Sequence, residues 1–420
     1  MSILIKNIEL NKKIQDILIE GNTIARIGSS IDYNADIEID GTNKAVVPGL
    51  FNGHTHAAMT LMRGYADDMP LMPWLQEKIW PLEKNITEED VYWGTKLACL
   101  EMIKTGTTLF IDMYHHAIAS ARATDEMGIR GMLTLAVLDF NDKEISEKFK
   151  KEIEQFHRAK TAFSNRLEIA LGPHAIYTVS KEMLCWMKGY ARANNIRIQT
   201  HLSETEIEVK DSISMFGCRP VNYLNSIGFL GPEISFAHSI YINDEEIKML
   251  ADNGCQVIHN PASNLKLASG THFRYGDLKK AGITVGIGTD GACSGNNLDM
   301  YEAMKLASLN AKAAWNDPTL WNADETFAAA TKTAEIITGF KTGTIDVGYL
   351  ADIALIDLKK PEMTPNFNLI SNLVYSANGS VVDTLICDGN IIMKNHHVDG
   401  EEEIISKANE IAHNLVARKK

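Results

Sequence analysis

The chain has 420 residues, of which 45% are hydrophobic and 23% are charged. This composition is typical of a soluble globular protein with a large core, and it excludes a disordered or fibrous chain. The formal net charge of −13 disfavours nucleic acid as a partner, because no basic stripe offsets the repulsion from a phosphate backbone.

The cysteines and the apolar runs indicate a cellular compartment. Six cysteines are scattered along the chain without a CxxC pair, which predicts free thiols in a reducing environment. The first residues, MSILIKNIEL, lack the basic and apolar regions of a signal peptide. No apolar run approaches the ~20 residues that span a bilayer. We therefore expect a cytoplasmic protein that has no membrane partner.

Both ends of the chain have the pattern of short β-strands. Residues 1–50 alternate isoleucine with polar residues and break at Gly-Asn and Asp-Gly pairs, which are hairpin signals. The same pattern returns in residues 343–358 and 382–395. We expect residues 1–50 and 342–400 to build one small β-sandwich domain around a larger insert.

The insert, residues 51–341, alternates apolar β-branched runs with polar stretches of helical length. Near-continuous apolar strands that alternate with helices predict a parallel sheet buried on both faces, and hence an α/β fold. Eight such runs, counted from AVVPGLFNGHTH onward, are the number that closes a (β/α)8 barrel of the TIM type. An open, doubly wound sheet is the structural alternative. Residues 401–420 read as a C-terminal amphipathic helix that packs on the surface.

Polar residues end several of the predicted barrel strands, where the catalytic groups of such barrels lie. Taken singly, a strand-end histidine is often a hydrogen-bonded core residue, and a strand-end aspartate is often a helix N-cap. The combination is more specific, since five histidines and one aspartate gather at this end: His54, His56, His174, His201, His238 and Asp290.

The spacing of the first two histidines favours a metal site. Side chains alternate across a strand, so His54 and His56 lie on one face and can point to one metal inside the barrel. Imidazole nitrogens together with a carboxylate oxygen suit zinc and, less selectively, iron. No cluster of thiols competes for the metal.

The segments FNGHTH, THLSE, FAHS, HNPASNLKL and GIGTDG together resemble the amidohydrolase superfamily. Within it, nearly the whole chain resembles the 5-methylthioadenosine/S-adenosylhomocysteine deaminase group. The resemblance implies the metal ligands His54, His56, His201 and Asp290. Members with two metals place a bridging lysine at the end of strand four, where this chain reads LEIALGPHAIY without a lysine. This departure implies a single zinc ion, with iron as the alternative.

The resemblance also implies catalytic roles for three residues. Deamination of adenine requires hydroxide at C6 and protons for N1 and for the departing ammonia, and one carboxylate can move those protons. Glu204, three residues after His201, is the implied proton shuttle; its structural alternative is an acid in the first turn of a helix. His238 is implied to hold the attacking water, and Asp290 to accept a proton as well as to bind metal.

Substrate contacts follow from the same resemblance. Glu83 resembles an acid that accepts hydrogen bonds from a ribose diol, with a helix-start acid as the alternative. His174 is implied to face the purine or the sugar, and Ser294 to contact the base. Trp74 is expected to cover the pocket, with core packing as the alternative. Asn264, in the HNPASN segment, is interpreted as a residue that structures the loop.

One departure leaves the substrate open. Family members that act on S-adenosylhomocysteine carry arginines after strand three, whereas this chain has Leu135 at one such position. Lys148 or Lys150 aligns loosely with another. A nucleoside with a small or uncharged 5′ group, and adenosine itself, therefore fit as well as the homocysteine conjugate.

The predicted function is hydrolytic deamination of an adenosine-type nucleoside to the inosine analogue and ammonia. The candidate substrates are 5′-methylthioadenosine, S-adenosylhomocysteine, 5′-deoxyadenosine and adenosine. The alternatives are a guanine or cytosine deaminase, a triazine chlorohydrolase, and a non-catalytic scaffold that keeps the barrel. The superfamily tends to form homo-oligomers, so the resemblance favours one here.

Overall fold

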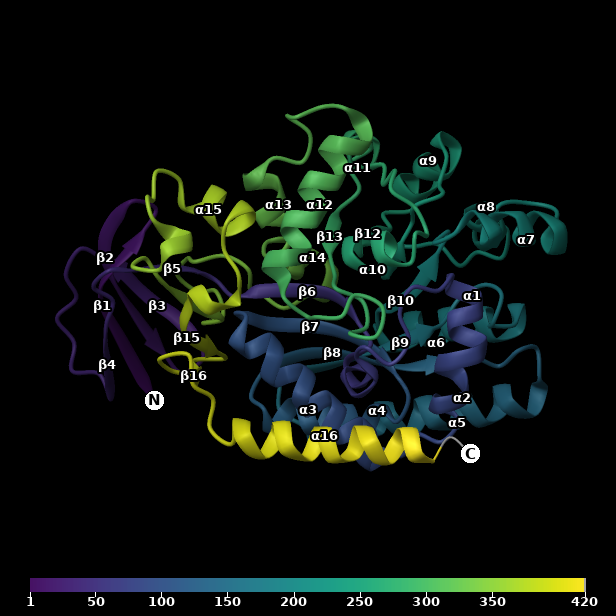
Figure 1. The fold of residues 1–420 in the computed structure, drawn as a ribbon, viewed down its shortest axis with the longest axis horizontal. Coiled ribbons are helices and arrows are strands. Elements are labelled where there is room, and N and C mark those ends of the chain that lie inside the picture. The colour runs from purple at the N-terminus through teal and green to yellow at the C-terminus, as the bar shows by residue number, and fades with distance from the viewer. Residues whose placement is uncertain (419–420) are drawn as a thin grey trace.

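The computed structural model describes residues 1–418 of the chain. In this part, eight consecutive parallel strands with almost wholly buried side chains form the barrel (Figure 1). The (β/α)8 barrel of the TIM type, and with it the α/β fold class, is therefore confirmed. The strands are β6 (Leu50–Thr55), β7 (Thr107–Tyr114), β8 (Arg130–Val137), β9 (Leu167–Pro173), β10 (Ile198–Leu202), β11 (Ile234–His238), β12 (Gln256–His259) and β13 (Val285–Ile287).

The barrel closes where the chain after β13 meets β6. The backbone N–H of Asp290 donates to the carbonyl oxygen of His54 over 3.0 Å, and β13 lies beside β6. This contact excludes the open, doubly wound sheet. It also places the polar side chains at the ends of the first and last strands next to each other.

Helices follow the strands and cover the outside of the barrel. Their bounds are α3 (Glu88–Lys104), α4 (Ala117–Glu126), α5 (Lys143–Ala159), α6 (Lys181–Asn194), α7 (Glu206–Phe216), α8 (Pro220–Ser226), α9 (Asp244–Asp252), α10 (Pro261–Lys266), α11 (Tyr275–Lys280), α12 (Met300–Trp315), α13 (Ala323–Ala329) and α14 (Thr333–Thr338).

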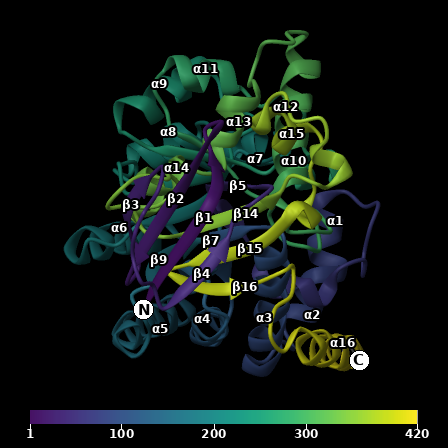
Figure 2. The same cartoon turned by 90° about the vertical axis from the view of Figure 1, so that its left-hand side faces the viewer.

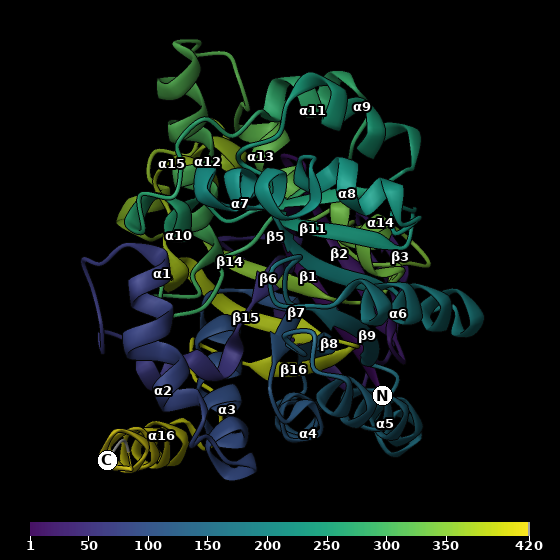
Figure 3. The ribbon, with the colours of Figure 1, turned by 90° about the vertical axis from the view of Figure 1, so that its right-hand side faces the viewer.

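A bent helical segment follows β6 and the short helix η1 (Ala57–Met62). It consists of α1 (Leu71–Trp74), the π-helical turn η2 (Leu75–Ile79) and α2 (Trp80–Glu83). Figure 3 shows α1 and α7 on the face of the barrel that carries the strand ends. π-helical turns are rare and are often found at functional sites.

The two ends of the chain form the small β domain together, as predicted (Figure 2). One mixed sheet runs in the order β16-β15-β14-β5-β1-β2-β3, with β4 paired to β1. Antiparallel pairing of β5 with β14 joins the N-terminal strands to the C-terminal ones. The strands are β1 (Ser2–Leu10), β2 (Lys13–Glu20), β3 (Thr23–Gly28), β4 (Ile37–Asp40), β5 (Lys44–Pro48), β14 (Ile353–Asp357), β15 (Val382–Cys387) and β16 (Asn390–Met393).

A buried ion pair ties the β domain to the barrel. Arg130, at the start of β8, donates from Nε to Asp352 Oδ2 and from Nη2 to Asp388 Oδ1, both over 3.0 Å. The Arg130 side chain is 2% exposed and that of Asp352 is 0% exposed, so neither charge can be satisfied by bulk water. The two parts of the molecule are therefore joined by paired charges as well as by apolar contacts.

The C-terminal helix α16 (Glu401–Ala417) lies along α3 (Figure 1). Its buried side chains recur every three or four residues, as expected for one face of a helix: Ile404, Ala408, Ile411 and Leu415. Residues 419–420 of the predicted helix lie outside the described residues. The remaining helices are η3 (Lys160–Ala162), η4 (Pro361–Met363), α15 (Leu369–Tyr375) and η5 (Gly379–Val381).

Two further sequence expectations can be compared with the structure. All six cysteines are free thiols. Within residues 1–418, no helix has the length and apolar character needed to cross a membrane.

Candidate metal centre and active site

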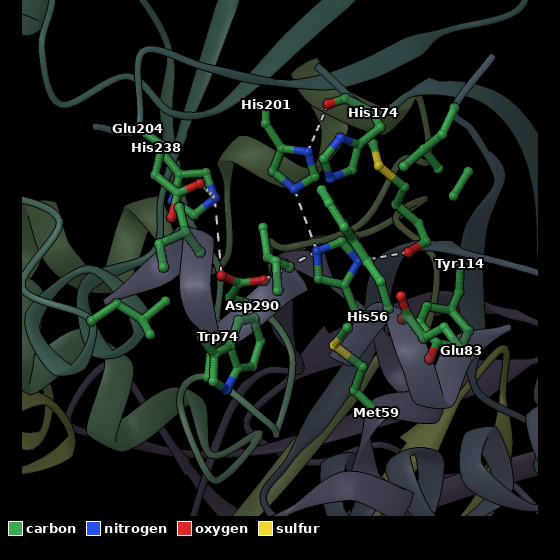
Figure 4. Close-up of a pocket in the computed structure, with 18 of the residues that line it drawn as sticks. His56, Met59, Trp74, Glu83, Tyr114, His174, His201, Glu204, His238 and Asp290 are labelled. Carbon is green, nitrogen blue, oxygen red and sulfur yellow. Dashed lines mark hydrogen bonds and ion pairs between the residues drawn. The ribbon is translucent and has the colours of Figure 1, made fainter. Parts of the chain in front are cut away.

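The strand ends bring the predicted ligands together at one point of the barrel mouth, and Figure 4 shows three of them, His56, His201 and Asp290. His201 Nε2 lies 3.1 Å from His54 Nε2 and 3.3 Å from His56 Nε2. Asp290 Oδ1 lies 3.2 Å from His56 Nε2 and 3.7 Å from His54 Nε2. Four side chains from three distant segments of the sequence thus direct one ligand atom each to the same small space.

The far sides of two of these rings contact backbone carbonyl oxygens. His56 Nδ1 lies 2.6 Å from the carbonyl oxygen of Met113, and His201 Nδ1 lies 2.7 Å from that of His174. Because a carbonyl oxygen can only accept a hydrogen bond, both rings carry their proton on Nδ1. Their Nε2 atoms therefore face the common space. Burial lowers the pKa of His56, but the hydrogen bond and the charge of Asp290 outweigh burial and raise this pKa to about 9, so a metal ion bound there would displace a proton from His56 Nε2.

A glutamine fixes the proton of the third ring, that of His54, on Nδ1. Gln199 Nε2 donates to the carbonyl oxygen of Gly53 over 2.8 Å, which turns Gln199 Oε1 toward His54 Nδ1 at 2.7 Å. His54 also carries its proton on Nδ1 as a result. Burial is the main reason that the pKa of His54 falls to about 3, so this ring stays neutral.

The donor set fits a divalent metal ion. Three imidazole nitrogens and one carboxylate oxygen converge at contact distances, and a cation, either a proton on His56 or a metal ion, lowers the repulsion among them. Hydrogen bonds behind each ligand that fix its ring and its tautomer are typical of metal sites. No lysine lies at the end of β9, where the chain reads Gly172-Pro173-His174.

His238 lies beside the four ligands but is held differently. Its Nδ1 lies 3.1 Å from Nδ2 of Asn264, which can only donate, and 3.4 Å from Oδ1 of Asn264, which can only accept; the shorter contact favours a proton on the opposite nitrogen, Nε2. That nitrogen lies 3.7 Å from Glu204 Oε2 and 3.9 Å from Asp290 Oδ2. His238 is therefore arranged to donate a hydrogen bond into the site. Asn264, interpreted from the sequence as a loop residue, also orients this histidine.

Glu204 is a buried carboxyl group that lines the cavity. Burial and, after it, the negative charge of Asp290 raise the pKa of Glu204 to about 8. A carboxyl group with a pKa near the working pH can both accept and donate a proton.

Glu204 does not have its alternative role, that of an acid in the first turn of α7, because other residues hold those positions. The N-cap of α7 is Thr205, and the acids of its first turn are Glu206 and Glu208. The Glu208 carboxylate accepts hydrogen bonds from the backbone N–H groups of Ser203 and Glu204, each over 2.8 Å. The Glu204 side chain is thereby left to face the cavity.

Three residues at the strand ends have left-handed backbone conformations, with φ of 47° at Ser203, 71° at His238 and 63° at Asp290. Such conformations cost about 1–3 kcal/mol each in residues other than glycine, and they concentrate at active sites. The surrounding hydrogen bonds therefore hold this rim in a geometry that the chain alone disfavours.

The cavity in front of these residues has a volume of about 70 Å³. Trp74 donates from its indole nitrogen to the carbonyl oxygen of Ala66 over 2.9 Å, so it packs in the core and also faces the cavity. The structure thus places every predicted substrate contact at the cavity wall: Trp74, Glu83, His174, Glu204 and Ser294.

The cavity wall includes residues that the sequence analysis does not identify. Tyr114 ends β7 and His115 follows it, while Trp80 and Tyr177 come from the loops and helices of the rim. Tyr114 and His115 obey the same strand-end rule as the ligands, in the segment DMYHH. Their signal is weak, because a tyrosine at a strand end fits core packing equally well.

The sequence profile of the Amidohydrolase family matches residues 45–392. This match covers most of the chain, including both halves of the barrel mouth. The chain belongs to the amidohydrolase family and is an enzyme of the hydrolase class.

Individual relatives are similar over nearly the full length. A 5′-deoxyadenosine deaminase of Methanoregula boonei is 44% identical, covering 99% of this chain and 96% of the relative. The 5-methylthioadenosine/S-adenosylhomocysteine deaminase 1 of Archaeoglobus fulgidus is 46% identical, covering 94% of each chain.

Solved structures share the fold. An adenosine deaminase from Xanthomonas campestris with bound zinc has a TM-score of 0.91 at 29% identity, covering 99% of this chain and 98% of its own. An atrazine chlorohydrolase from Arthrobacter aurescens has a TM-score of 0.88 at 22% identity, covering 98% of this chain and 100% of its own, and shows the fold alone.

Proposed function

We propose that the chain is a metal-dependent deaminase that converts an adenosine-type nucleoside to its inosine analogue and ammonia. The observation that carries this proposal is the convergence of His54, His56, His201 and Asp290 directly beside the buried carboxyl group of Glu204. The deaminase relatives support the substrate class, since they are named for 5′-deoxyadenosine, 5-methylthioadenosine and S-adenosylhomocysteine.

We propose that these four residues hold one zinc ion, with iron as the alternative. The donor set supports zinc, and the absence of a lysine after β9 supports a single ion. When bound, such an ion supplies Lewis acidity, which makes water acidic enough to serve as a nucleophile near neutral pH.

The residues around the ligands perform the proton transfers. Glu204, with a pKa of about 8, takes a proton from the attacking water and delivers it to N1 of the purine. His238 donates from Nε2 to the oxygen that attacks C6 and stabilises its developing negative charge. Asp290 accepts the second proton, which is passed to the departing ammonia.

The cavity wall positions the nucleoside. Glu83 accepts hydrogen bonds from the ribose hydroxyls, at the opposite side of the cavity from Glu204. Trp74 covers the base, while Ser294 and His174 contact the base and the sugar. We keep 5′-deoxyadenosine, 5′-methylthioadenosine, adenosine and S-adenosylhomocysteine as candidate substrates.

Ammonia release from a panel of compounds tests this function. The panel contains the four adenosine derivatives together with guanine, cytosine and a chlorotriazine. We expect at least one adenosine derivative to be deaminated by the zinc-loaded protein and the activity to disappear after removal of metal with a chelator. Turnover of guanine, cytosine or the triazine alone would contradict the proposal. A protein that binds no metal and deaminates nothing would support the scaffold alternative.

A further inference from the structure

Tyr114 closes one wall of the cavity next to Glu83. Tyr114 is the last residue of β7 and is 2% exposed, while Glu83 is the last residue of α2. Both line the cavity, and they lie side by side across from Glu204 and His238 (Figure 4). Two elements that are separate in the sequence therefore place a phenol and a carboxylate together at the sugar end of the proposed site.

The buried Tyr114 hydroxyl lacks the well-formed hydrogen bond that buried polar groups normally have, and the half-buried Glu83 carboxylate faces the same part of the cavity. Among residues 1–418, the Tyr114 hydroxyl has no hydrogen-bond partner of good geometry, although the Glu83 carboxylate lies close enough to interact with it. Burial, and after it the charge of Glu83 and the hydrogen bond toward its carboxylate, raises the pKa of Tyr114 well above its ordinary value, so the hydroxyl keeps its proton. Buried polar groups are nearly always hydrogen-bonded, so a ligand that carries hydroxyl groups would satisfy both.

A vicinal diol has the complementary chemistry. Its two O–H groups donate to the two oxygens of a carboxylate, and its oxygens accept from a phenol. We infer that Tyr114 is a specificity-determining residue, which donates a hydrogen bond to the ribose diol beside Glu83 and thereby selects ribonucleosides over deoxyribonucleosides. The inference rests on the proposed function and extends it to the choice of sugar.

The selection of ribose over deoxyribose follows from the free-energy cost of leaving polar groups of the cavity wall without a hydrogen bond. A 2′-deoxy or 3′-deoxy sugar removes one hydroxyl and leaves Tyr114 or Glu83 without a partner in the closed complex. Sites built to hydrogen-bond a substrate hydroxyl reject analogues that lack it far more strongly than apolar sites reject a missing methylene. Removing the phenol hydroxyl therefore weakens the selection for ribose.

The experiment compares kcat/KM for adenosine, 2′-deoxyadenosine and 3′-deoxyadenosine in the wild type and in Tyr114→Phe. We expect Tyr114→Phe to lower kcat/KM for adenosine roughly three- to tenfold, the value of one hydrogen bond. For at least one deoxynucleoside, kcat/KM should fall much less in this variant. The ratio of kcat/KM for adenosine to kcat/KM for that deoxynucleoside therefore falls by a similar factor. The loss should lie mainly in KM, because Tyr114 lies on the other side of the cavity from Glu204.

Tyr301→Phe is the matched control. Tyr301 in α12 is also buried, and its hydroxyl also lacks a partner among the described residues, but it does not line the cavity. This variant should keep all three kcat/KM values. The double variant that combines Tyr114→Phe with Glu83→Gln should lose less kcat/KM for adenosine than the product of the two single-variant losses, because both residues bind the same diol.

An equal loss on all three substrates in Tyr114→Phe would assign Tyr114 a structural role and overturn the inference. An unchanged ratio in an active, folded variant would do the same. If the wild type deaminates none of the four adenosine derivatives of the panel, the proposed function itself fails; if it deaminates one of them but not adenosine, the 2′-deoxy and 3′-deoxy forms of that nucleoside are compared instead. Thermal unfolding checks that the variants fold, and Tyr114→Met removes the same hydroxyl if the phenylalanine variant does not.

Discussion

Glu204 provides the clearest prediction for a single residue. Its carboxyl group is buried, faces the cavity and lies 3.7 Å from His238. Glu204→Gln keeps the size of the side chain but cannot shuttle a proton. We expect kcat to fall by about 10²- to 10⁴-fold, the usual contribution of a general acid–base group, while the metal content of the protein stays unchanged.

The control for this prediction is Glu206→Gln. Glu206 belongs to the first turn of the neighbouring helix, its side chain is 63% exposed, and it pairs with Lys210 on the surface. Steady-state kinetics and elemental analysis of both variants measure the two effects separately. A Glu204→Gln enzyme with near wild-type kcat would mean that another group moves the proton.

The residues that the sequence identifies best are those whose type and spacing are unusual. In His54-Thr55-His56 the two predicted ligands are two residues apart, a spacing that puts side chains on the same face of a strand. The structure places both rings at one point. Gln199 and Asn264 were not predictable as partners of histidines, because their side chains gain this role only through contacts across the barrel. An amide in a buried strand or a loop has no distinctive pattern in the sequence.

Among the elements, the turn from β10 to α7 supports the catalytic rim most directly. The Glu208 carboxylate accepts hydrogen bonds from two backbone N–H groups of this turn, at Ser203 and Glu204. Glu208→Ala leaves both donors buried without a partner. We expect the free energy of unfolding to fall by about 2–4 kcal/mol, since two buried N–H groups lose their acceptor. The kcat should fall too, because the position of Glu204 loosens.

Chemical denaturation and kinetics of Glu208→Ala measure these changes. Asp211→Ala, an exposed change on the same helix, is the control and should leave both quantities near those of the wild type. If Glu208→Ala keeps the wild-type stability and kcat, the turn does not depend on this carboxylate.

The barrel strands are the elements that the sequence predicts most clearly. Fully buried parallel strands carry long apolar runs, such as Thr107–Tyr114 and Arg130–Val137. The segment from α1 to α2 is harder to predict, because Pro73 and Pro81 interrupt the helical pattern in the sequence. In the structure, the prolines lie at early positions of two short helical pieces, joined by the π-helical turn.

For the whole molecule, the pair of Arg130 with Asp352 gives a stability prediction. Arg130→Met removes a buried cation and leaves the carboxylates of Asp352 and Asp388 without it. We expect the free energy of unfolding to fall by about 3–5 kcal/mol, because an unpaired buried charge is costly. The active site should be less affected than the stability, since Arg130 starts its strand at the opposite end from the metal ligands.

Denaturation of Arg130→Met beside Arg192→Met tests this prediction. The Arg192 side chain is 61% exposed and pairs with Glu233, so its removal should change stability little. Equal stability of the two variants would show that the buried pair does not hold the β domain on the barrel.

The long-range pairing of the chain ends could be predicted only in outline. Similar strand patterns at both ends indicate one shared domain, but the order of its strands depends on contacts that the sequence does not display. The parallel pairing of β4 with β1 is an example. The domain bounds, the cytoplasmic location and the homo-oligomeric state stay predictions.

The pairing of β5 with β14 has a consequence for synthesis on the ribosome. Pro48 of β5 pairs with Ile353 of β14, which is 305 residues later in the chain (353 − 48). At about 5–20 residues per second, translation needs about 15–60 s to supply that partner. Until then one side of β5 is an open strand edge, so the nascent chain has an interval in which chaperones, or neighbouring nascent copies, compete with β14 for the same hydrogen bonds.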